Sequence, residues 1–296
     1  MDEPVTRRGF ELADPDEPTR RVRGRVHLPP REDEQEGELP WALVLHGFKG
    51  FMDWGFFPLL CDRLARRGVA AVAFNASGSG VGPDGESFSE LESFRRDTLS
   101  RQLEDVERVR GLALGGELGP LSATRRALFG HSRGGGMAIV HAAEDGGYRA
   151  VATWAALDSF DRWDEATKQL WRRNGEIRVL NSRTGQELPM GVGMLQDFER
   201  NRDRFDVLAS AARLRAPLLV VHGAEDPVVP ISAGRALHEA AAHAEPFVRV
   251  EGEGHTLGAT HPLERLAPAL ERALESTTSW LARNLIQDPS PGAAGA

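Results

Sequence analysis

Short apolar runs alternate with longer amphipathic stretches along most of the chain from residue 41 onward. The short runs have the length of buried strands, and the longer stretches carry apolar residues at helical spacing. Strands are predicted at residues 41–45, 69–74, 126–129, 149–154, 218–221 and 247–250. Helices are predicted at residues 58–67, 94–112, 134–144, 205–214, 233–243 and 262–282. This alternation predicts an α/β fold in which a mostly parallel central sheet is flanked by helices on both faces.

One stretch interrupts the alternation, and both chain ends lie outside it. Residues 156–205 contain a predicted hairpin at 176–188 but no regular strand and helix rhythm, so we expect a small lid insertion at the carboxyl edge of the sheet. The acidic run at 32–38 is predicted to be a hairpin loop. The expected organisation is an N-terminal tail at 1–19, one α/β domain at 20–286 and a flexible C-terminal tail at 287–296.

Composition narrows the class of protein. The 296 residues are 41% hydrophobic and 27% charged, which excludes disorder of the whole chain. A net charge of −8 offers no basic field to a nucleic acid, and no run is apolar and long enough for a signal peptide or a membrane span. Cys61 is the single cysteine, so an intrachain disulfide is excluded. We expect a cytoplasmic monomer or homodimer with neither nucleic acid nor a membrane as its partner.

The strongest chemical motif is Gly130-His131-Ser132-Arg133-Gly134, which lies between a predicted strand and a predicted helix. A sharp turn at this point would lift the serine hydroxyl clear of the sheet, and glycines are needed where strand, turn and helix approach closely. A serine hydroxyl is a poor nucleophile until a base removes its proton. The motif therefore predicts Ser132 as a nucleophile and requires a base near it.

An acid and a histidine follow later strands in the order that such a site needs. Asp226 comes just after the strand at 218–221, and His255 comes just after the strand at 247–250. A carboxylate that holds the histidine in one tautomer completes a catalytic triad. Two alternatives stay open for the acid: Asp158, which follows the strand at 149–154, could replace Asp226, and Asp226 could instead stabilise a turn.

Backbone amides are predicted to stabilise the negative charge that develops on a carbonyl oxygen. The residue after the nucleophile, Arg133, would supply one amide. Phe48, in the segment His46-Gly47-Phe48 that ends the first strong apolar strand, would supply the other. Both residues would then act through the backbone rather than through their side chains.

With these motifs in place, the chain resembles the α/β-hydrolase fold family, and in particular its serine esterases of the dienelactone-hydrolase-like and cinnamoyl- or feruloyl-esterase-like kind. The resemblance spans most of the chain and implies a Ser132–Asp226–His255 triad, an acyl-enzyme mechanism and no metal or organic cofactor. True dienelactone hydrolases carry cysteine, and haloalkane dehalogenases carry aspartate, where this chain has Ser132, so both of those activities are disfavoured. The motifs that carry the resemblance are His46-Gly47-Phe48, Gly130-His131-Ser132-Arg133-Gly134, Gly223-Ala224-Glu225-Asp226-Pro227-Val228-Val229-Pro230 and Gly254-His255.

Large apolar side chains near these loops and in the expected insertion are candidates for the wall of a substrate pocket. They are Trp54, Trp163, Trp171 and Met194, and Lys49 is a candidate to steer an anionic substrate. The predicted function is hydrolysis of small-molecule carboxylic esters with small to medium acyl groups. Thioesterases, aminopeptidases and acyltransferases use the same triad and stay alternatives, as does a non-catalytic ligand-binding protein of this fold.

Overall fold

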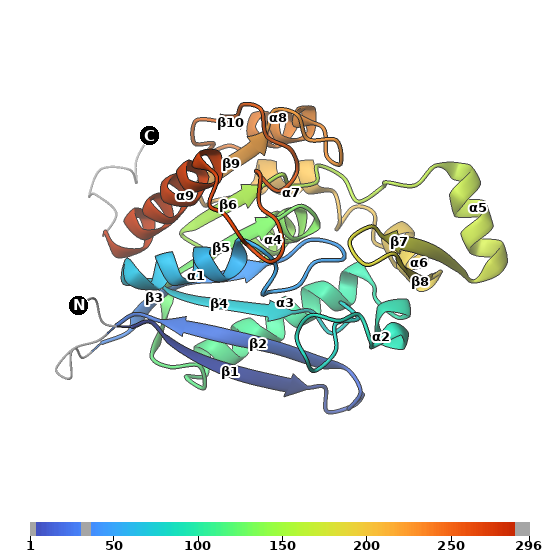
Figure 1. The fold of residues 1–296 in the computed structure, drawn as a ribbon, viewed down its shortest axis with the longest axis horizontal. Coiled ribbons are helices and arrows are strands. Elements are labelled where there is room, and N and C mark those ends of the chain that lie inside the picture. The colour runs from blue at the N-terminus through green and yellow to red at the C-terminus, as the bar shows by residue number, and fades with distance from the viewer. Residues whose placement is uncertain (1–3, 31–36, 288–296) are drawn as a thin grey trace.

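The computed structural model describes residues 4–30 and 37–287. Its centre is an eight-stranded sheet with the order β1-β2-β4-β3-β5-β6-β9-β10 (Figure 1). Neighbouring strands from β4 to β10 are parallel, whereas β2 runs antiparallel to both β1 and β4. The strands are β1 (Thr6–Ala13), β2 (Arg21–Leu28), β3 (Leu39–Leu45), β4 (Ala70–Asn75), β5 (Leu121–His131), β6 (Ala150–Trp154), β9 (Leu218–Gly223) and β10 (Val248–Val250).

Helices cover both faces of the sheet. One face carries α1 (Phe57–Arg66) and α9 (Pro268–Ile286). The other face carries α3 (Leu99–Leu114), α4 (Arg133–Asp145), α7 (Val207–Arg213) and α8 (Ile231–Ala240).

The central strand β3 shows why its sequence is a continuous apolar run. Trp41 and Leu43 belong to the core on the side of α3 and α4, whereas Ala42 and Val44 belong to the core on the side of α1 and α9. All four are buried, because successive side chains of a strand point to opposite faces and both faces are covered. The α/β class predicted from the apolar pattern is therefore confirmed, with every predicted strand present.

Two predicted helices differ in their bounds. Residues 94–112 do not form one helix but α2 (Leu91–Arg95) and α3, because Thr98 caps α3 by accepting a hydrogen bond from the Arg101 amide at 3.1 Å. The helix predicted from residue 262 begins only at Pro268, where the proline occupies the first turn of α9.

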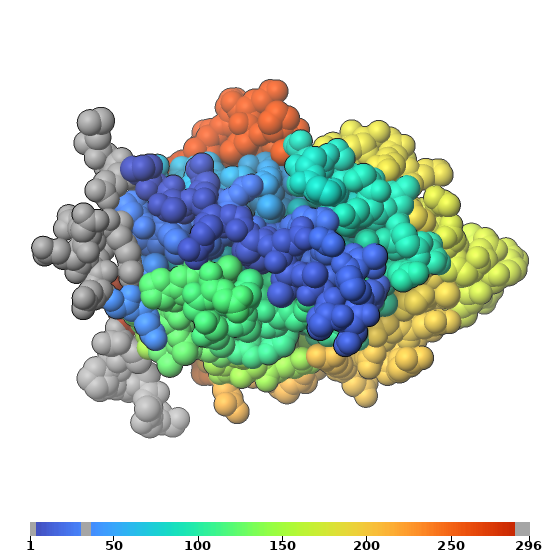
Figure 2. All heavy atoms as spheres, turned by 90° about the horizontal axis from the view of Figure 1, so that it is seen from below, coloured from blue at the N-terminus to red at the C-terminus, as the bar shows by residue number. Residues whose placement is uncertain are grey.

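The N-terminal tail predicted at 1–19 is wrong for residues 6–13, which form the edge strand β1. This strand pairs with β2 along its whole length and appears in dark blue on the surface in Figure 2. Only Phe10 and Leu12 of β1 contact the core, so the strand has too little apolar pattern to be predicted. Ion pairs of its Glu11 with Arg21 and Arg23 of β2 help to hold it.

The hairpin predicted around the acidic run at 32–38 is also wrong, because β2 lies between β1 and β4 and does not pair with β3. Residues 31–36 of that run lie outside the described residues. So do residues 288–296 of the predicted C-terminal tail.

The segment at 156–205, which we call the insertion, lies beyond the carboxyl ends of the parallel strands (Figure 1). Its predicted hairpin is present as the antiparallel pair β7–β8, and Trp171 is fully buried beneath it, with Nε1 donating to the Met190 carbonyl oxygen at 2.8 Å. None of the described helices combines the length and the apolar character needed to cross a membrane. The elements of the insertion are α5 (Glu165–Asn174), β7 (Glu176–Asn181), β8 (Gln186–Gly191) and α6 (Gly193–Arg200).

Candidate active site

The loops that follow β3 and β5 meet at the carboxyl edge of the sheet. β3 pairs with β4 on one side and with β5 on the other, so the order of the strands reverses at this point. In open parallel sheets such a reversal leaves a crevice in which ligands bind. Phe48 follows β3 and Ser132 follows β5, so both residues lie at this crevice.

Ser132 occupies a strained turn between β5 and α4. Its φ of 57° and ψ of −120° form a conformation that non-glycine residues rarely adopt, at a cost of about 1–3 kcal/mol. The surroundings hold it in place, because its amide donates to the Trp154 carbonyl oxygen at 2.9 Å and its carbonyl oxygen accepts from the Leu157 amide at 3.2 Å. This is the strand-to-helix turn that the glycine-flanked motif predicts.

The glycines around Ser132 are needed for close approach. A Cβ atom at Gly130 would lie 2.2 Å from the Gly134 carbonyl oxygen. A Cβ atom at Gly134 would lie 2.5 Å from the carbonyl oxygens of Leu45 and His46. A side chain at Gly130 would therefore separate β5 from the start of α4, and one at Gly134 would separate α4 from the end of β3.

Asp226 and His255 come together from the loops after β9 and β10, which are neighbouring parallel strands. His255 donates from Nδ1 to Asp226 Oδ2 at 2.7 Å. The other carboxylate oxygen, Oδ1, accepts hydrogen bonds from the amides of Val228 and Val229 at 2.8 Å and 2.9 Å. Asp226 therefore both stabilises its own turn and orients His255. Within the described residues, no hydrogen bond joins His255 to Asp158.

The Asp226 carboxylate is held in its charged form. Burial opposes ionisation, but hydrogen bonds from His222, His255 and the Val229 amide outweigh burial, so the pKa of Asp226 lies well below its usual range. The sequence does not predict a reacting role for His222. Its Nε2 lies 3.5 Å from Asp226 Oδ2 and 2.9 Å from the Val229 carbonyl oxygen. Both neighbours are acceptors, so this nitrogen carries the hydrogen.

His131, the residue before Ser132, connects the turn of Ser132 to the loop of His255. Its Nε2 donates to the His255 carbonyl oxygen at 2.9 Å, and the two rings lie 4.7 Å apart. Burial, with the nearby His255, lowers the pKa of His131 to about 3, so the ring is neutral. The hydrogen bond therefore fixes the position of the His255 backbone relative to Ser132.

The amides of Phe48 and Arg133 have no acceptor within residues 4–30 and 37–287. Arg133 is the first residue of α4, and the first amides of a helix point outward with a partial positive charge. Both residues line the same cleft as Ser132. Two unpaired donors beside a nucleophile can stabilise a developing oxyanion.

The cleft that contains Ser132 and His255 has a volume of about 680 Å³. Its wall includes the aromatic and thioether residues predicted for a substrate pocket. Two of them are half-buried, and two are buried in the insertion. The half-buried residues are Trp54 and Trp163, and the buried residues are Trp171 and Met194.

Polar residues of the β7–β8 turn also line the cleft, and these were not predicted. Asn181 ends β7 and Arg183 lies in the turn that follows, where nothing in the sequence pattern indicates that the chain returns to the site. Lys49 lines the cleft as well, and its Nζ donates to the Leu180 carbonyl oxygen at 2.7 Å. The loop after β3 is therefore tied to the insertion.

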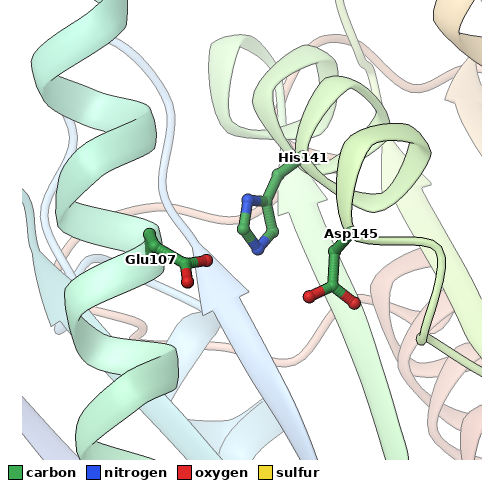
Figure 3. Close-up of side chains that lie close together, drawn as sticks. All are labelled: Glu107, His141 and Asp145. Carbon is green, nitrogen blue, oxygen red and sulfur yellow. The ribbon is translucent and has the colours of Figure 1, made fainter.

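A second group of ionisable side chains lies between α3 and α4. Glu107, His141 and Asp145 face one another (Figure 3), with possible ligand atoms within 4.8 Å. Both carboxylates already have cationic partners, because Arg110 bonds Glu107 at 2.8 Å and Arg126 bonds Asp145 at 2.5 Å. We interpret this cluster as a network that joins the two helices.

Comparison with known proteins identifies the family. The sequence profile of the alpha/beta hydrolase family matches residues 42–269. The chain belongs to the alpha/beta hydrolase family. The match includes the loops of Phe48, Ser132, Asp226 and His255, and no curated protein sequence matches the chain.

Solved structures share the fold of this alpha/beta hydrolase. Est1E from Butyrivibrio proteoclasticus is similar with a TM-score of 0.66 and 16% identity over 94% of this chain and 99% of that chain. The esterase domain of a Rhodothermus marinus protein has a TM-score of 0.61 and 20% identity over 94% and 98% of the two chains. A puromycin-hydrolyzing peptidase of Mycobacterium tuberculosis has a TM-score of 0.66 and 22% identity over 97% of this chain but 40% of that chain.

Proposed function

We propose that this alpha/beta hydrolase is a serine hydrolase that cleaves carboxylic esters of small to medium acyl groups. The observation that carries the proposal is the 2.7 Å hydrogen bond from His255 Nδ1 to Asp226, in a protein whose cleft is lined by both His255 and Ser132. A hydrogen on Nδ1 leaves Nε2 free to accept a proton. The strain at Ser132 supports its role as the nucleophile.

In the proposed reaction, His255 Nε2 takes the hydroxyl proton of Ser132 as Oγ attacks the ester carbonyl carbon. The amides of Phe48 and Arg133 bind the oxyanion of the tetrahedral intermediate. His255 then gives the proton to the departing alkoxide, which leaves an acyl group on Ser132. Water attacks this acyl-enzyme with His255 again as base, and the carboxylic acid is released.

The cleft and the neighbours support an ester as the substrate. A volume of about 680 Å³ and a partly aromatic wall suit a small organic molecule. One structural neighbour is named as an esterase domain, which favours ester hydrolysis. Aminopeptidase activity is the second candidate, because another neighbour is a puromycin-hydrolyzing peptidase.

The test combines turnover with labelling of the serine. Hydrolysis of p-nitrophenyl esters of increasing acyl length is measured for the wild type and Ser132→Ala, and aminoacyl p-nitroanilides test the peptidase alternative. A fluorophosphonate should add once to the wild type and not to the variant, as read by intact mass. Turnover retained in Ser132→Ala, or a folded wild type that is neither labelled nor active on any ester, would contradict the proposal.

A further inference from the structure

The cleft of this acidic protein carries unpaired positive charge. The whole chain has a net charge of −8, yet Lys49, Arg162 and Arg183 line the cleft without a carboxylate partner within the described residues. The acidic side chain that lines the cleft, Asp161, already pairs with Lys168 at 2.5 Å. The local field therefore favours a negatively charged group on the ligand.

Arg183 is positioned by the β7–β8 turn. Its guanidinium lies 5.2 Å from the centre of the Phe51 ring, and its amide donates to Asn181 Oδ1 at 3.2 Å. The side chain is exposed, so its planar donors remain available for a carboxylate, which the guanidinium can bind in bidentate fashion.

Asn181 adds a donor that the protein itself leaves unpaired. The residue is 4% exposed and lines the cleft, and its Nδ2 has no acceptor within the part of the chain that the structure describes. A buried donor without a partner costs about 1–3 kcal/mol, so an oxygen atom of a ligand would relieve this cost.

Lys49 brings a third donor to the same place. Its ammonium bonds the carbonyl oxygen of Leu180, the residue directly before Asn181. An ammonium group has three hydrogens, so this bond leaves others for a ligand. Lys49 and Asn181 therefore approach the cleft from the loop after β3 and from the insertion, respectively.

We propose that Asn181, Arg183 and Lys49 form a subsite for a carboxylate that the substrate carries in addition to its ester. The proposal rests on the proposed esterase function and assigns its substrate class as half-esters or other esters with one free carboxylate. Arg162, also exposed at the cleft, strengthens the positive field around the subsite.

Two matched pairs of esters test this subsite and show which side of the ester carries the carboxylate. The acyl-side pair is monomethyl terephthalate and methyl 4-carbamoylbenzoate. The alcohol-side pair is 4-acetoxybenzoate and 4-acetoxybenzamide. Carboxylate and carboxamide are similar in size, so the kcat/KM ratio within a pair reports the charge. We expect a preference of about tenfold or more for the carboxylate in at least one pair.

Substitutions at Asn181 and Arg183 test the subsite without changing the groups proposed to react. Arg183→Gln should reduce the carboxylate preference, and so should Asn181→Asp, which keeps Oδ1 for the Arg183 amide but replaces Nδ2 with an anionic oxygen. The control is Arg178→Gln on β7, which removes an arginine that pairs with Glu176 at 3.0 Å and should leave the preference unchanged.

The possible outcomes keep the two proposals apart. If none of the four esters is hydrolysed, the result counts against the esterase function. Equal hydrolysis of both members of each pair, or a preference that survives both Arg183→Gln and Asn181→Asp in folded protein, overturns the carboxylate subsite.

Discussion

The guanidinium carbon of Arg133 lies 3.9 Å from the centre of the Phe48 ring. The side chain of the residue after Ser132 therefore packs on the residue proposed to offer the second oxyanion donor. Arg133 Nη1 lies 3.9 Å from Asp97 Oδ2, and the Phe94 ring stacks on Phe48 at 5.7 Å. Burial raises the pKa of Asp97 to about 7 and lowers the pKa of Arg133 to about 10. The ring of Phe48 thus packs on a buried polar pair, which we expect to help position the Phe48 amide.

Arg133→Met should lower kcat about tenfold with a smaller change in KM, because a misplaced Phe48 amide weakens binding of the transition state more than of the substrate. The Arg133 amide itself is kept in this variant. Steady-state kinetics on one ester measure the effect. The double variant Arg133→Met/Asp97→Asn tests whether the loss of kcat in Arg133→Met comes only from leaving Asp97 buried and unpaired. In the double variant we expect stability to recover while kcat stays low. An unchanged kcat in Arg133→Met would contradict a positioning role.

Asp226→Asn should lower kcat by about 10³–10⁴ while the protein stays folded. The asparagine oxygen can still accept the Val228 and Val229 amides, but its amide group cannot orient His255 in the same tautomer. Kinetics and thermal unfolding of the same samples separate the two roles. Asp158→Asn is the matched control and should stay within a few-fold of the wild type. A large loss in Asp158→Asn would point to the alternative acid.

Gly134→Ala should lower both stability and activity. The added Cβ would lie 2.5 Å from backbone oxygens of Leu45 and His46, so β3 or α4 must move, at a cost of about 1–3 kcal/mol. Gly111→Ala in α3 is the matched control, because a Cβ there meets nothing within 4 Å and should add about 0.5–1 kcal/mol of stability. Denaturant unfolding gives both values, and equal stability of the two variants would refute the argument.

Four histidines should make this protein less stable as the pH falls below about 6.5, whereas the raised pKa values of Asp97 and Asp105 act in the opposite direction. The pKa values of His27, His46, His131 and His141 are lowered, mainly by burial, whereas histidines in the unfolded chain titrate near about 6.5. As the pH falls below that value, the unfolded state binds protons that the folded state does not, so the free energy of unfolding decreases. With a folded pKa of about 3, His131 accounts for about 2 kcal/mol of the loss between pH 7 and pH 5.

Urea unfolding at pH 7 and pH 5 checks this pH dependence. His131→Gln should lose less stability between the two values than the wild type loses. His243→Gln, a change at an exposed position, should lose as much as the wild type. If the free energy of unfolding of His131→Gln changed with pH as much as that of the wild type, His131 would not be the source of this pH dependence.

The sequence predicts those parts of the fold and site that depend on local pattern. β3 is recognisable because both of its faces are buried, and Ser132, Asp226 and His255 are recognisable because each lies at or in the loop after a strand of a parallel sheet. β1 is not recognisable, because it is an exposed edge strand. His222 reaches Asp226 only because the loop after β9 turns back on the strand end, which no spacing in the sequence reveals.

The insertion supplies none of the groups proposed to react. Ser132 precedes residues 156–205, and Asp226 and His255 follow them, while Asn181 and Arg183 lie within them. The proposed triad and two of the three residues of the proposed subsite are thereby encoded in separate stretches of the chain, while Lys49 lies in the loop after β3. Recombination that exchanges this one continuous segment would replace both insertion residues of the proposed subsite in a single event and leave the proposed triad unchanged.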